Sequence, residues 1–495
     1  MTKQEAPVAD STFPWSKSNL PKQLFINNEF VDAKSLKKLE VHNPKDGSLL
    51  ADDVSLAGEQ DVDAAVAAAE AAFPAWKKTP AMKRRDLLLK LADLIDQYMT
   101  NLAELSRISM GAPYTSIGAL ETRGSAQAYR YFAGWCDKFA GETYPQDDGF
   151  LKIVQNEPLG VTVGITPWNG PTAVVALKSA PALATGNCFI LKPSEKTPFS
   201  ALALATLVKA AGFPPGVFQV LPGDGTTGAL LASHMKVRKI SFTGSTATGR
   251  KIQEMAAKSN LKRVTLELGG KSPAVVFDDA NLENAISWCV RAICLNTGQV
   301  CVAASRVYVQ EGIYDKFLEG YKKAMEEQGK TVGDPDATET QMGPIVDKAQ
   351  FDRVSGFLER GRSQGTLLTG GSRVGEKGYF VQPTVFTDVA EDAEICKNEI
   401  FGPVSILNKF KTEEEIIAKA NDTKYGLMAG IFTQDINRAL RISSELDSGM
   451  VGINCISLTF LNAPFGGTKE SGMGQAIKPE KQDTGFDASD GSEEG

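Results

Sequence analysis

The sequence predicts an α/β protein with two units, each built on a mostly parallel sheet. Short apolar runs rich in β-branched residues alternate with helical patterns between residues 153 and 242, and the alternation returns between residues 264 and 446. The length of 495 residues also exceeds the usual single-domain range of about 50–250 residues. Sheets of this kind bind ligands at the carboxyl ends of their strands, so functional residues are expected there.

The N-terminal part is expected to be mainly helical. Residues 1–20 are polar and contain proline, which predicts a flexible arm, and residues 24–31 predict a β-hairpin that turns at two asparagines. Helices are expected at residues 61–73, 81–99 and 118–139, the first ending before a proline. Residues 141–155 resemble a second hairpin that could contribute to an interface between subunits.

The two α/β units follow in order. In the first, strands are expected at residues 161–165, 187–191, 217–221 and 239–242, with helices at 174–183 and 200–211. In the second, strands are expected at 264–268, 274–277, 306–309 and 366–368, with helices at 282–295, 314–327, 348–362 and 436–446 and a further segment at 415–420.

Composition excludes several classes of protein. The net charge is −7 and no basic stripe is visible, so a nucleic-acid partner is not expected. The apolar runs are too short to cross a bilayer, and residues 1–10 show no targeting signal, so neither a membrane partner nor secretion is expected. Seven scattered cysteines without a CxxC pair suit a reduced, cytoplasmic setting and predict no metal site.

Histidine chemistry is also unexpected. The chain has two histidines, His42 and His234, and neither lies beside a serine or cysteine motif. If acid–base catalysis occurs, a carboxylate or a lysine must therefore carry it.

The segment from Asn296 to Cys301 is the strongest candidate for a catalytic site. Cys301 follows a polar, glycine-containing turn after an apolar helix, whereas Cys289 and Cys294 lie on that helix and fit a role in the core. A free thiol has a pKa of about 8.5, so only about a few per cent is thiolate at pH 7. A nucleophilic Cys301 would need help from nearby backbone amides or from a base.

Two polar residues could assist a nucleophile. Glu267 lies in an apolar strand before two glycines, where burial would raise its pKa as a general base requires; alternatively it is a structural carboxylate paired with Lys271 or an arginine. Asn169 follows the predicted strand 161–165 and could donate to an oxyanion, or it could bond within its own turn.

Two turns at strand ends could hold a nucleotide. The turn that contains Gly244, Ser245 and Gly249 joins a strand to a helix, so its backbone amides could face a phosphate; it lacks the GxGxxG and Walker patterns and could be an ordinary tight turn. Lys192 and Glu195 end another strand, where they could hold a ribose or form a solvated pair. A carboxylate on the ribose 2′-hydroxyl favours NAD.

Together these segments resemble the aldehyde dehydrogenase superfamily, in particular its mitochondrial and retinal-type branch. The resemblance runs from Leu24 to about Gly474. Seven motifs occur in the family's order and at similar spacing: Pro167 to Asn169, Lys192 to Glu195, Phe242 to Ser245, Glu267 to Lys271, Gly298 to Cys301, Glu399 to Pro403 and Pro464 to Gly467.

The resemblance implies a fold with a Rossmann-like NAD-binding domain, a second α/β catalytic domain and a small β oligomerisation element. The expected divisions are an arm (1–20), the NAD-binding domain (21–138 and 156–265), the catalytic domain (266–452), the oligomerisation element (139–155 and 453–480) and a disordered acidic tail (481–495).

The resemblance also implies the reaction, which is oxidation of an aldehyde to a carboxylic acid with NAD, NADP being left open. Cys301 would be the nucleophile that forms a thiohemiacetal and then a thioester, Asn169 the oxyanion donor and Glu267 the base that activates the hydrolytic water. The implied cofactor residues are Thr166, Pro167, Trp168, Lys192, Glu195, Gly225, Phe242, Gly244, Ser245, Gly249, Leu268, Gly269, Glu399 and Phe401.

The sequence departs from the family in two places. Gly170 and Leu177 stand where related enzymes carry aromatic or bulky residues, which predicts a wider substrate tunnel and a bulky aldehyde, such as one of secondary metabolism. The expected tunnel residues are Gly170, Ala173, Val174, Leu177, Val300, Val302 and Phe465. Residues 475–495 lack the family's final strand, which predicts a weakened homodimer or homotetramer.

Two alternatives remain open at this point. A CoA-acylating enzyme would use the same thioester, although Glu267 argues against it because that chemistry needs no hydrolytic base. A catalytically idle protein on the same fold is the other alternative, since a fold does not determine a function.

Overall fold

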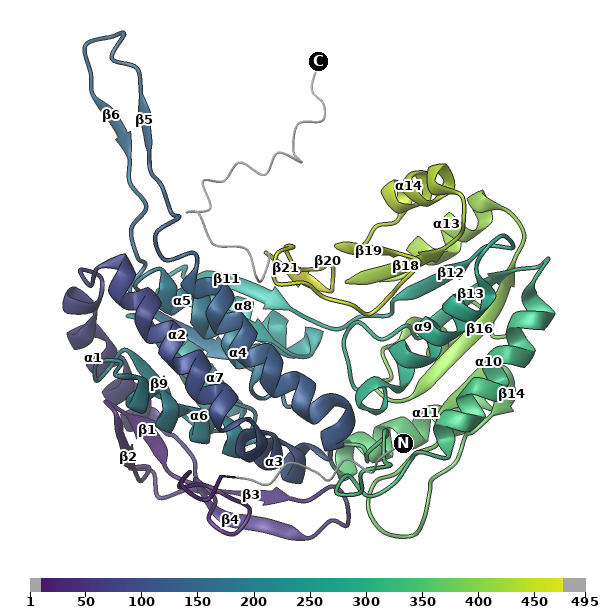
Figure 1. The fold of residues 1–495 in the computed structure, drawn as a ribbon, viewed down its shortest axis with the longest axis horizontal. Helices are drawn as coiled ribbons and strands as arrows, with labels where there is room; N and C mark the ends of the chain where they lie inside the picture. The colour runs from purple at the N-terminus through teal and green to yellow at the C-terminus, as the bar shows by residue number, and fades with distance from the viewer. Residues whose placement is uncertain (1–9, 475–495) are drawn as a thin grey trace.

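Two mostly parallel sheets, one in each lobe, organise the computed structural model, which describes residues 10–474 (Figure 1). The first sheet has the order β2-β1-β9-β8-β7-β10-β11-β21. Its strands are β1 (Leu24–Ile26), β2 (Glu29–Val31), β7 (Val161–Ile165), β8 (Cys188–Lys192), β9 (Phe218–Val220), β10 (Lys239–Thr243), β11 (Arg263–Glu267) and β21 (Gly472–Met473).

The five middle strands of this sheet are parallel and place their carboxyl ends along one edge. From β7 the chain adds β8 and β9 on one side, and then β10 and β11 on the other. The strand order therefore reverses between β7 and β10, which is where an open α/β sheet forms a ligand crevice.

Helices of the first lobe cover this sheet, so β7 and β8 are buried at every position. Helices α1 and α5 contact β7 and β8, and α2 and α4 pack on α5. The helices are α1 (Glu59–Trp76), α2 (Ala81–Gln97), α3 (Met99–Met110), η1 (Tyr114–Gly118, a π-helix), α4 (Ala119–Ala133), α5 (Ala173–Ala184), α6 (Pro198–Ala211), α7 (Gly225–Ser233) and α8 (Thr246–Lys258).

The second sheet has the order β14-β15-β16-β13-β12-β18-β19, with β14 antiparallel to the rest. Its strands are β12 (Pro273–Val276), β13 (Arg306–Gln310), β14 (Thr366–Thr369), β15 (Thr384–Thr387), β16 (Val404–Phe410), β18 (Met428–Phe432) and β19 (Met450–Ile453). The helices of this lobe are α9 (Leu282–Cys294), η2 (Leu295–Gly298), α10 (Tyr314–Gly329), α11 (Lys348–Gly361), α12 (Glu394–Lys397), α13 (Glu413–Asn421) and α14 (Ile436–Glu445).

Three small two-stranded sheets complete the described fold. They pair β3 (Lys38–His42) with β4 (Leu49–Ser55), β5 (Glu142–Tyr144) with β6 (Lys152–Val154), and β17 (Tyr425–Gly426) with β20 (Thr468–Lys469). The predicted hairpin at residues 141–155 is confirmed as β5 and β6, which project from the first lobe (Figure 1).

The predicted fold class is confirmed, as are the predicted strands and the hairpin at residues 24–31. Asn27 and Asn28 adopt positive φ angles of 54° and 63°, as its two-residue turn requires. The assignment of strand 264–268 to the second unit is wrong, because β11 pairs with β10 in the first sheet.

Several predicted helix boundaries are wrong. Helix α1 continues past Pro74 to Trp76, because the proline removes only one hydrogen bond and Lys77 N–H still donates to Phe73 O at 2.9 Å. The helix expected at 81–99 ends at Gln97 and is followed by a separate helix, α3, which was not predicted.

The prediction of a flexible arm is wrong for residues 10–20. Phe13 is buried and stacks on Tyr98 with ring centroids 4.8 Å apart, and Trp15 Nε1 donates to Thr206 Oγ1 at 2.8 Å. Apolar anchors thus fix this segment to α3 and α6 despite its polar composition. Residues 1–9 and the expected acidic tail at 481–495 lie outside the described residues.

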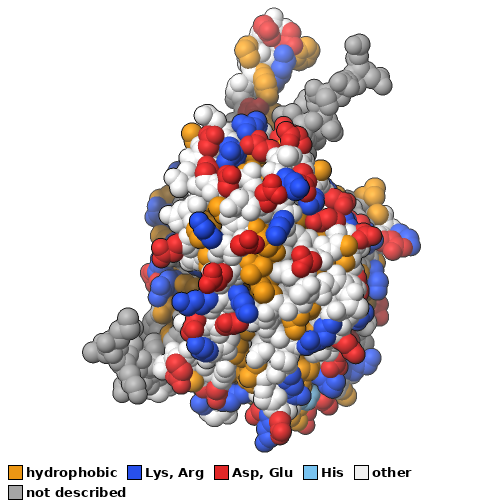
Figure 2. All heavy atoms as spheres, turned by 90° about the vertical axis from the view of Figure 1, so that its right-hand side faces the viewer, with side chains coloured by type: hydrophobic (Ala, Val, Ile, Leu, Met, Phe, Trp, Pro, Cys, Tyr) orange, Lys and Arg blue, Asp and Glu red, His pale blue; other side chains and the backbone are white. Residues whose placement is uncertain are grey.

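On the face drawn in Figure 2, acidic and basic side chains are interspersed, and hydrophobic side chains are visible on the projecting hairpin at the top. Among residues 10–474, no helix has the length and apolar character needed to span a membrane.

Candidate active site

Cys301 lies in a turn that follows α9 and η2, and it is partly exposed. Five of the other six free cysteines are buried, and only Cys455 is comparably accessible. A Cβ atom on Gly270 would lie 2.3 Å from the main-chain oxygen of Cys301. The glycine therefore lets the exit of β11, which carries Glu267, pass directly against the cysteine turn.

Asn169 reaches the same turn from the first lobe. It follows β7, and its side-chain Nδ2 donates to the main-chain oxygen of Gln299 at 2.8 Å. The amide nitrogen carries two hydrogens, and this bond uses one of them. Asn169 is thus held beside the segment that presents Cys301.

Glu267 is the last residue of β11 and is 2% exposed. Its charged neighbour is Lys178 of α5, which is also buried and whose Nζ donates to Ser241 Oγ at 2.8 Å. Burial lowers the pKa of Lys178 to about 8, although the negative charge of Glu267 opposes this shift. Sequence reasoning did not identify Lys178 as a site residue. The feature that could have indicated it is a single lysine within an apolar helix that begins just after Asn169.

Lys271, which the sequence offered as a structural partner of Glu267, lies in a different cluster. Its main-chain oxygen accepts from Arg306 Nε at 2.9 Å, and burial lowers its pKa to about 7. The charged groups that act on this amine include Cys396, Arg306 and Glu399.

The Cys301 thiol is strongly protonated in this arrangement. Burial raises its pKa to about 12, and the negative charges of Glu399 and Glu267 add to the shift. A thiol whose pKa depends on specific neighbouring charges in this way is typical of a functional site. Changes in those charges, or in the solvent around them, would change its reactivity.

The predicted cofactor residues of the first lobe meet along one edge of the sheet. They follow or end five neighbouring parallel strands, on both sides of the crevice between β7 and β10. In strand order they are Gly225 after β9, Lys192 and Glu195 at the end of β8, Thr166, Pro167 and Trp168 after β7, Phe242, Gly244, Ser245 and Gly249 at the end of β10 and the start of α8, and Leu268 and Gly269 after β11.

This edge has the chemistry that a dinucleotide needs. Lys192 Nζ lies 3.4 Å from Glu195 Oε2, which places an amine and a carboxylate side by side. Ser245 caps α8 by accepting from Thr248 N at 3.3 Å, so the positive end of a long helix faces the crevice. Thr166 Oγ1 is buried and has no hydrogen-bond partner among the described residues. The residues present therefore fit a nucleotide cofactor.

Glu399 and Phe401 reach this edge from the second lobe. Glu399 Oε1 accepts from Gly270 N at 2.9 Å, and burial raises the pKa of this carboxyl group to about 7. A Cβ atom on Gly269 would lie 2.4 Å from Glu399 Oε2, so the glycine is required here. Phe401 has a φ of 60°. Its ring is nearly perpendicular to that of Trp168, and the two ring centroids are 5.4 Å apart.

The predicted tunnel residues divide into three groups. Ala173, Val174 and Leu177 lie partly exposed on the first turns of α5, next to Asn169. Val300 and Phe465 are partly buried. Gly170 and Val302 are buried instead, and Val302 belongs to the hydrophobic core of the second lobe.

Glu121 is a site residue that the sequence did not reveal. Its buried carboxylate accepts from the main-chain N–H groups of Thr172 and, at 2.8 Å, of Ala173, which begin α5. It thereby fixes the loop that carries Asn169. No local pattern marked it, because its partners lie about 50 residues along the chain.

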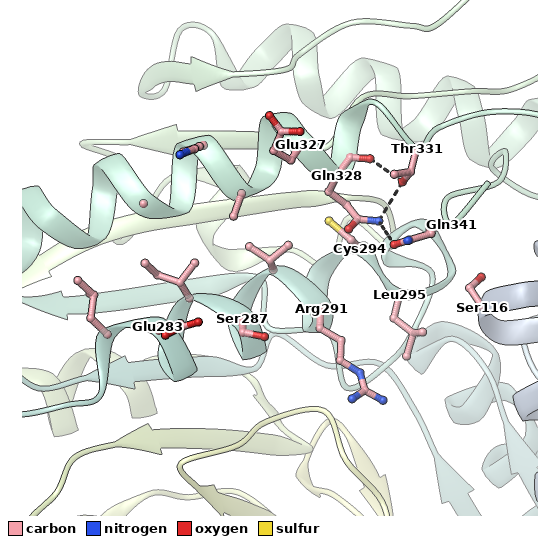
Figure 3. A pocket seen from close by; sticks show the side chains of 16 residues that line it. Ser116, Glu283, Ser287, Arg291, Cys294, Leu295, Glu327, Gln328, Thr331 and Gln341 are labelled. Carbon is pink, nitrogen blue, oxygen red and sulfur yellow. Dashed lines mark hydrogen bonds between the residues drawn. The ribbon is translucent and has the colours of Figure 1, made fainter. Parts of the chain in front are cut away.

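A groove of about 1070 Å³ between α9 and α10 is separate from this site (Figure 3). Its described lining includes Cys294 and Arg291 from α9 and Gln328 from α10, whose Nε2 donates to Thr331 Oγ1 at 3.1 Å. None of the predicted site residues is among the described residues that line it.

Comparison with known proteins identifies the family of the chain. Residues 30–484 match the profile of the Aldehyde dehydrogenase family. The chain is 45% identical over 458 residues to "Aldehyde dehydrogenase" of Agaricus bisporus (92% of this chain, 91% of the relative) and 44% identical over 461 residues to "Retinaldehyde dehydrogenase 3" of Homo sapiens (92% and 89%). It superimposes with a TM-score of 0.90 on the NAD+ complex of an aldehyde dehydrogenase from Bacillus cereus, at 42% identity and 94% coverage of both chains.

The environment of Cys301 predicts how its thiol reacts with iodoacetamide in the absence of cofactor. Because the thiolate fraction rises about tenfold per pH unit below the pKa, the alkylation rate should keep rising from about pH 7 to about pH 10. Glu399→Gln should accelerate alkylation at a fixed pH, because it removes a negative charge that raises the thiol pKa. Cys455 is also partly exposed and would be alkylated, so the rate measured for Cys301→Ala is subtracted. An alkylation rate that reaches a plateau at or below about pH 8.5 would contradict the prediction.

Proposed function

Because the chain belongs to the aldehyde dehydrogenase family, we propose that it oxidises an aldehyde to a carboxylic acid through a thioester on Cys301. One observation carries this proposal. A partly exposed thiol has two groups of the other lobe acting on it or on its segment: Asn169 donates to Gln299 O in the cysteine segment, and the charge of Glu267 acts on the thiol.

In the proposed reaction, the partly exposed Cys301 thiol loses its proton to solvent, and the thiolate sulfur attacks the carbonyl carbon of the aldehyde. The carbonyl oxygen becomes a negatively charged oxyanion, which the Asn169 amide and the main-chain N–H of Cys301 stabilise. Addition is needed because an aldehyde carbon does not readily release hydride until a nucleophile has bonded to it. Bound NAD or NADP supplies the hydride acceptor, and what remains on the protein is a thioester.

Hydrolysis of the thioester requires a water molecule and a base, for which we assign Glu267. Its carboxylate takes a proton from the water, whose oxygen bonds to the thioester carbon while the bond to the Cys301 sulfur breaks. Glu267 is 2% exposed, so few water molecules can compete for its carboxylate. The buried amine of Lys178 is the positive charge that interacts with it.

Members of this family use NAD or NADP, and NAD is our proposal for this chain. The support is the carboxylate of Glu195 beside Lys192, which would accept from a ribose 2′-hydroxyl and repel a 2′-phosphate. The proposed contacts of Glu399 and Phe401 are with the ribose next to the nicotinamide.

The two sheets support the proposed domain division. The first lobe corresponds to the NAD-binding domain at 21–138 and 156–265, and the second to the catalytic domain at 266–452. The hairpin at 139–155 would form the oligomerisation element. Of the residues 453–480 that the sequence also assigned to it, β20 pairs with β17 and β21 pairs with β11 of the first sheet, and residues 475–480 lie outside the described part. A cytoplasmic location suits the seven free cysteines.

Separating the two halves of the reaction tests the catalytic roles. Cys301→Ala should abolish aldehyde-dependent NADH formation. Glu267→Gln should still give a first burst of NADH, while steady-state turnover falls about 10²–10⁴-fold because the thioester is no longer hydrolysed efficiently. Rapid-mixing absorbance measurements report both phases.

Equal steady-state rates for Glu267→Gln and the unaltered enzyme would exclude Glu267 as the base. Adding CoA distinguishes the acylating alternative, because only an acylating enzyme would turn over faster in its presence. If the protein forms no NADH or NADPH from any aldehyde, the catalytically idle alternative is favoured.

A panel of aldehydes with both cofactors tests the proposed substrate class. Ala173, Val174 and Leu177 are small or aliphatic and lie partly exposed beside Asn169, so a bulky aldehyde of the kind found in secondary metabolism should fit. We expect a higher kcat/KM for naphthaldehyde than for acetaldehyde, and a higher one with NAD than with NADP. A clear preference for acetaldehyde would refute the wide tunnel.

Light scattering tests the proposed assembly. The hairpin presents exposed apolar side chains, including Phe150, Leu151 and Ile153, and β19 is an edge strand among the described residues, so both could pair with a second copy. Because residues 475–495 lack a strand pattern, we expect a homodimer or homotetramer that dissociates on dilution. A tetramer that persists at nanomolar concentration would contradict this expectation.

A further inference from the structure

The backbone immediately before Cys301 is in an unusual conformation. Asn296, Thr297 and Gly298 have φ angles of 48°, 56° and 71°, so three successive residues are left-handed. This region suits glycine but disfavours a β-branched residue such as Thr297. Such a turn persists only if its surroundings hold it in place.

Side-chain hydrogen bonds hold this turn to the segment 343–346. Thr297 Oγ1 donates to Gly343 O at 2.8 Å. Gln299 Nε2 donates to Asn296 O at 3.0 Å and to Pro344 O at 3.4 Å, and its Oε1 accepts from Val346 N at 2.9 Å. The Gln299 side chain is fully buried, and both of its donor hydrogens are used.

The main chain of Gln299 has a second role. Its oxygen accepts from Asn169 Nδ2 at 2.8 Å and from Asn296 Nδ2 at 3.4 Å. The residue that anchors the cysteine turn therefore also fixes the direction of the Asn169 amide. An amide bonded in this way keeps its second hydrogen in a defined direction.

We propose that Gln299 is a positioning residue: its side chain holds the left-handed turn before Cys301, and its carbonyl aims the Asn169 amide at the substrate oxygen. This inference rests on the proposed function, because it assumes that Asn169 stabilises the oxyanion. Oxyanion donors act at about 2.7–3.1 Å, so the relative placement of sulfur and amide must be tightly controlled. Displacement by about 1 Å can reduce a rate about 100-fold.

Gln299→Met tests the side chain, because methionine fills similar volume without hydrogen bonds. Gln328→Met is the matched control: Gln328 also bridges loop groups through its side chain, but it lines the separate groove (Figure 3). With naphthaldehyde and NAD, Gln299→Met should lower kcat about 100-fold and leave the KM for NAD within about threefold, whereas Gln328→Met should leave kcat unchanged.

A double variant separates positioning from a general loss of stability. If Gln299 acts in part through Asn169, adding Gln299→Met to Asn169→Ala should slow the enzyme by much less than the about 100-fold expected of Gln299→Met alone. If the fold reductions in kcat of the two single variants multiply in the double variant, the proposal is overturned. A folded Gln299→Met enzyme with kcat close to that of the unaltered protein would also overturn it.

A second pair of variants applies if Gln299→Met does not fold. Thr297→Val removes the bond to Gly343 with little change in shape, and Thr297→Ser keeps it. We expect a large loss of kcat for Thr297→Val and recovery in Thr297→Ser. Equal activity of these two variants would overturn the proposed role of the turn.

Alkylation of Cys301 by iodoacetamide gives a reading that does not depend on turnover. Release of the turn should make alkylation faster in Gln299→Met than in Gln328→Met, and equal rates would count against the proposal. An unaltered protein that oxidises no aldehyde would refute the proposed function, whereas this comparison would still report whether Gln299 holds the turn.

Discussion

Burial of charge around one partly exposed sulfur is the constraint on which the rest of the structure depends. Glu267 and Glu399 act on the Cys301 thiol, the buried Lys178 interacts with Glu267, and Glu399 accepts a bond from the backbone of Gly270 beside the cysteine turn. An ionised group is costly to bury unless dipoles or opposite charges compensate. Burial moves the pKa of Lys178 to about 8 and that of Glu399 to about 7, so both groups can exchange protons near neutral pH. Strand ends from both sheets are needed to supply the compensating groups.

Two adjacent glycines allow the lobes to meet at this point. A side chain on Gly269 would strike the Glu399 carboxylate, and one on Gly270 would strike the Cys301 carbonyl. The two glycines that follow Glu267 are therefore required for steric reasons, because they let the end of β11 lie directly against groups of the second lobe. The same close approach lets Gly270 N donate to Glu399, which ties the candidate cofactor edge to the candidate nucleophile.

Sequence reasoning succeeded where the signal is local. The buried strands of the parallel sheets are apolar runs between turns, so the sequence alone places the residues at their carboxyl ends, such as Lys192 and Ser245, on one edge. It failed where a side chain acts over a long distance in the chain. Glu121 and Lys178 looked like isolated charges in helices, because their partners come from other elements. For the same reason, composition alone could not show that Phe13 stacks on Tyr98, between α2 and α3.

The C-terminal part of the described chain shows why the two lobes must be considered together. After the second sheet, the chain returns to the first, where β21 pairs with β11 and Leu268 N donates to Ser471 O at 2.8 Å. Ser471 Oγ donates to Gly269 O at 2.6 Å and accepts from Gly426 N at 2.9 Å, which links the end of β11 to the second lobe. These bonds hold the end of β11, which carries Glu267, on the side opposite β10. All of these bonds are made by residues up to Gly474, so the described part of the chain is sufficient to join the end of β11 to both lobes.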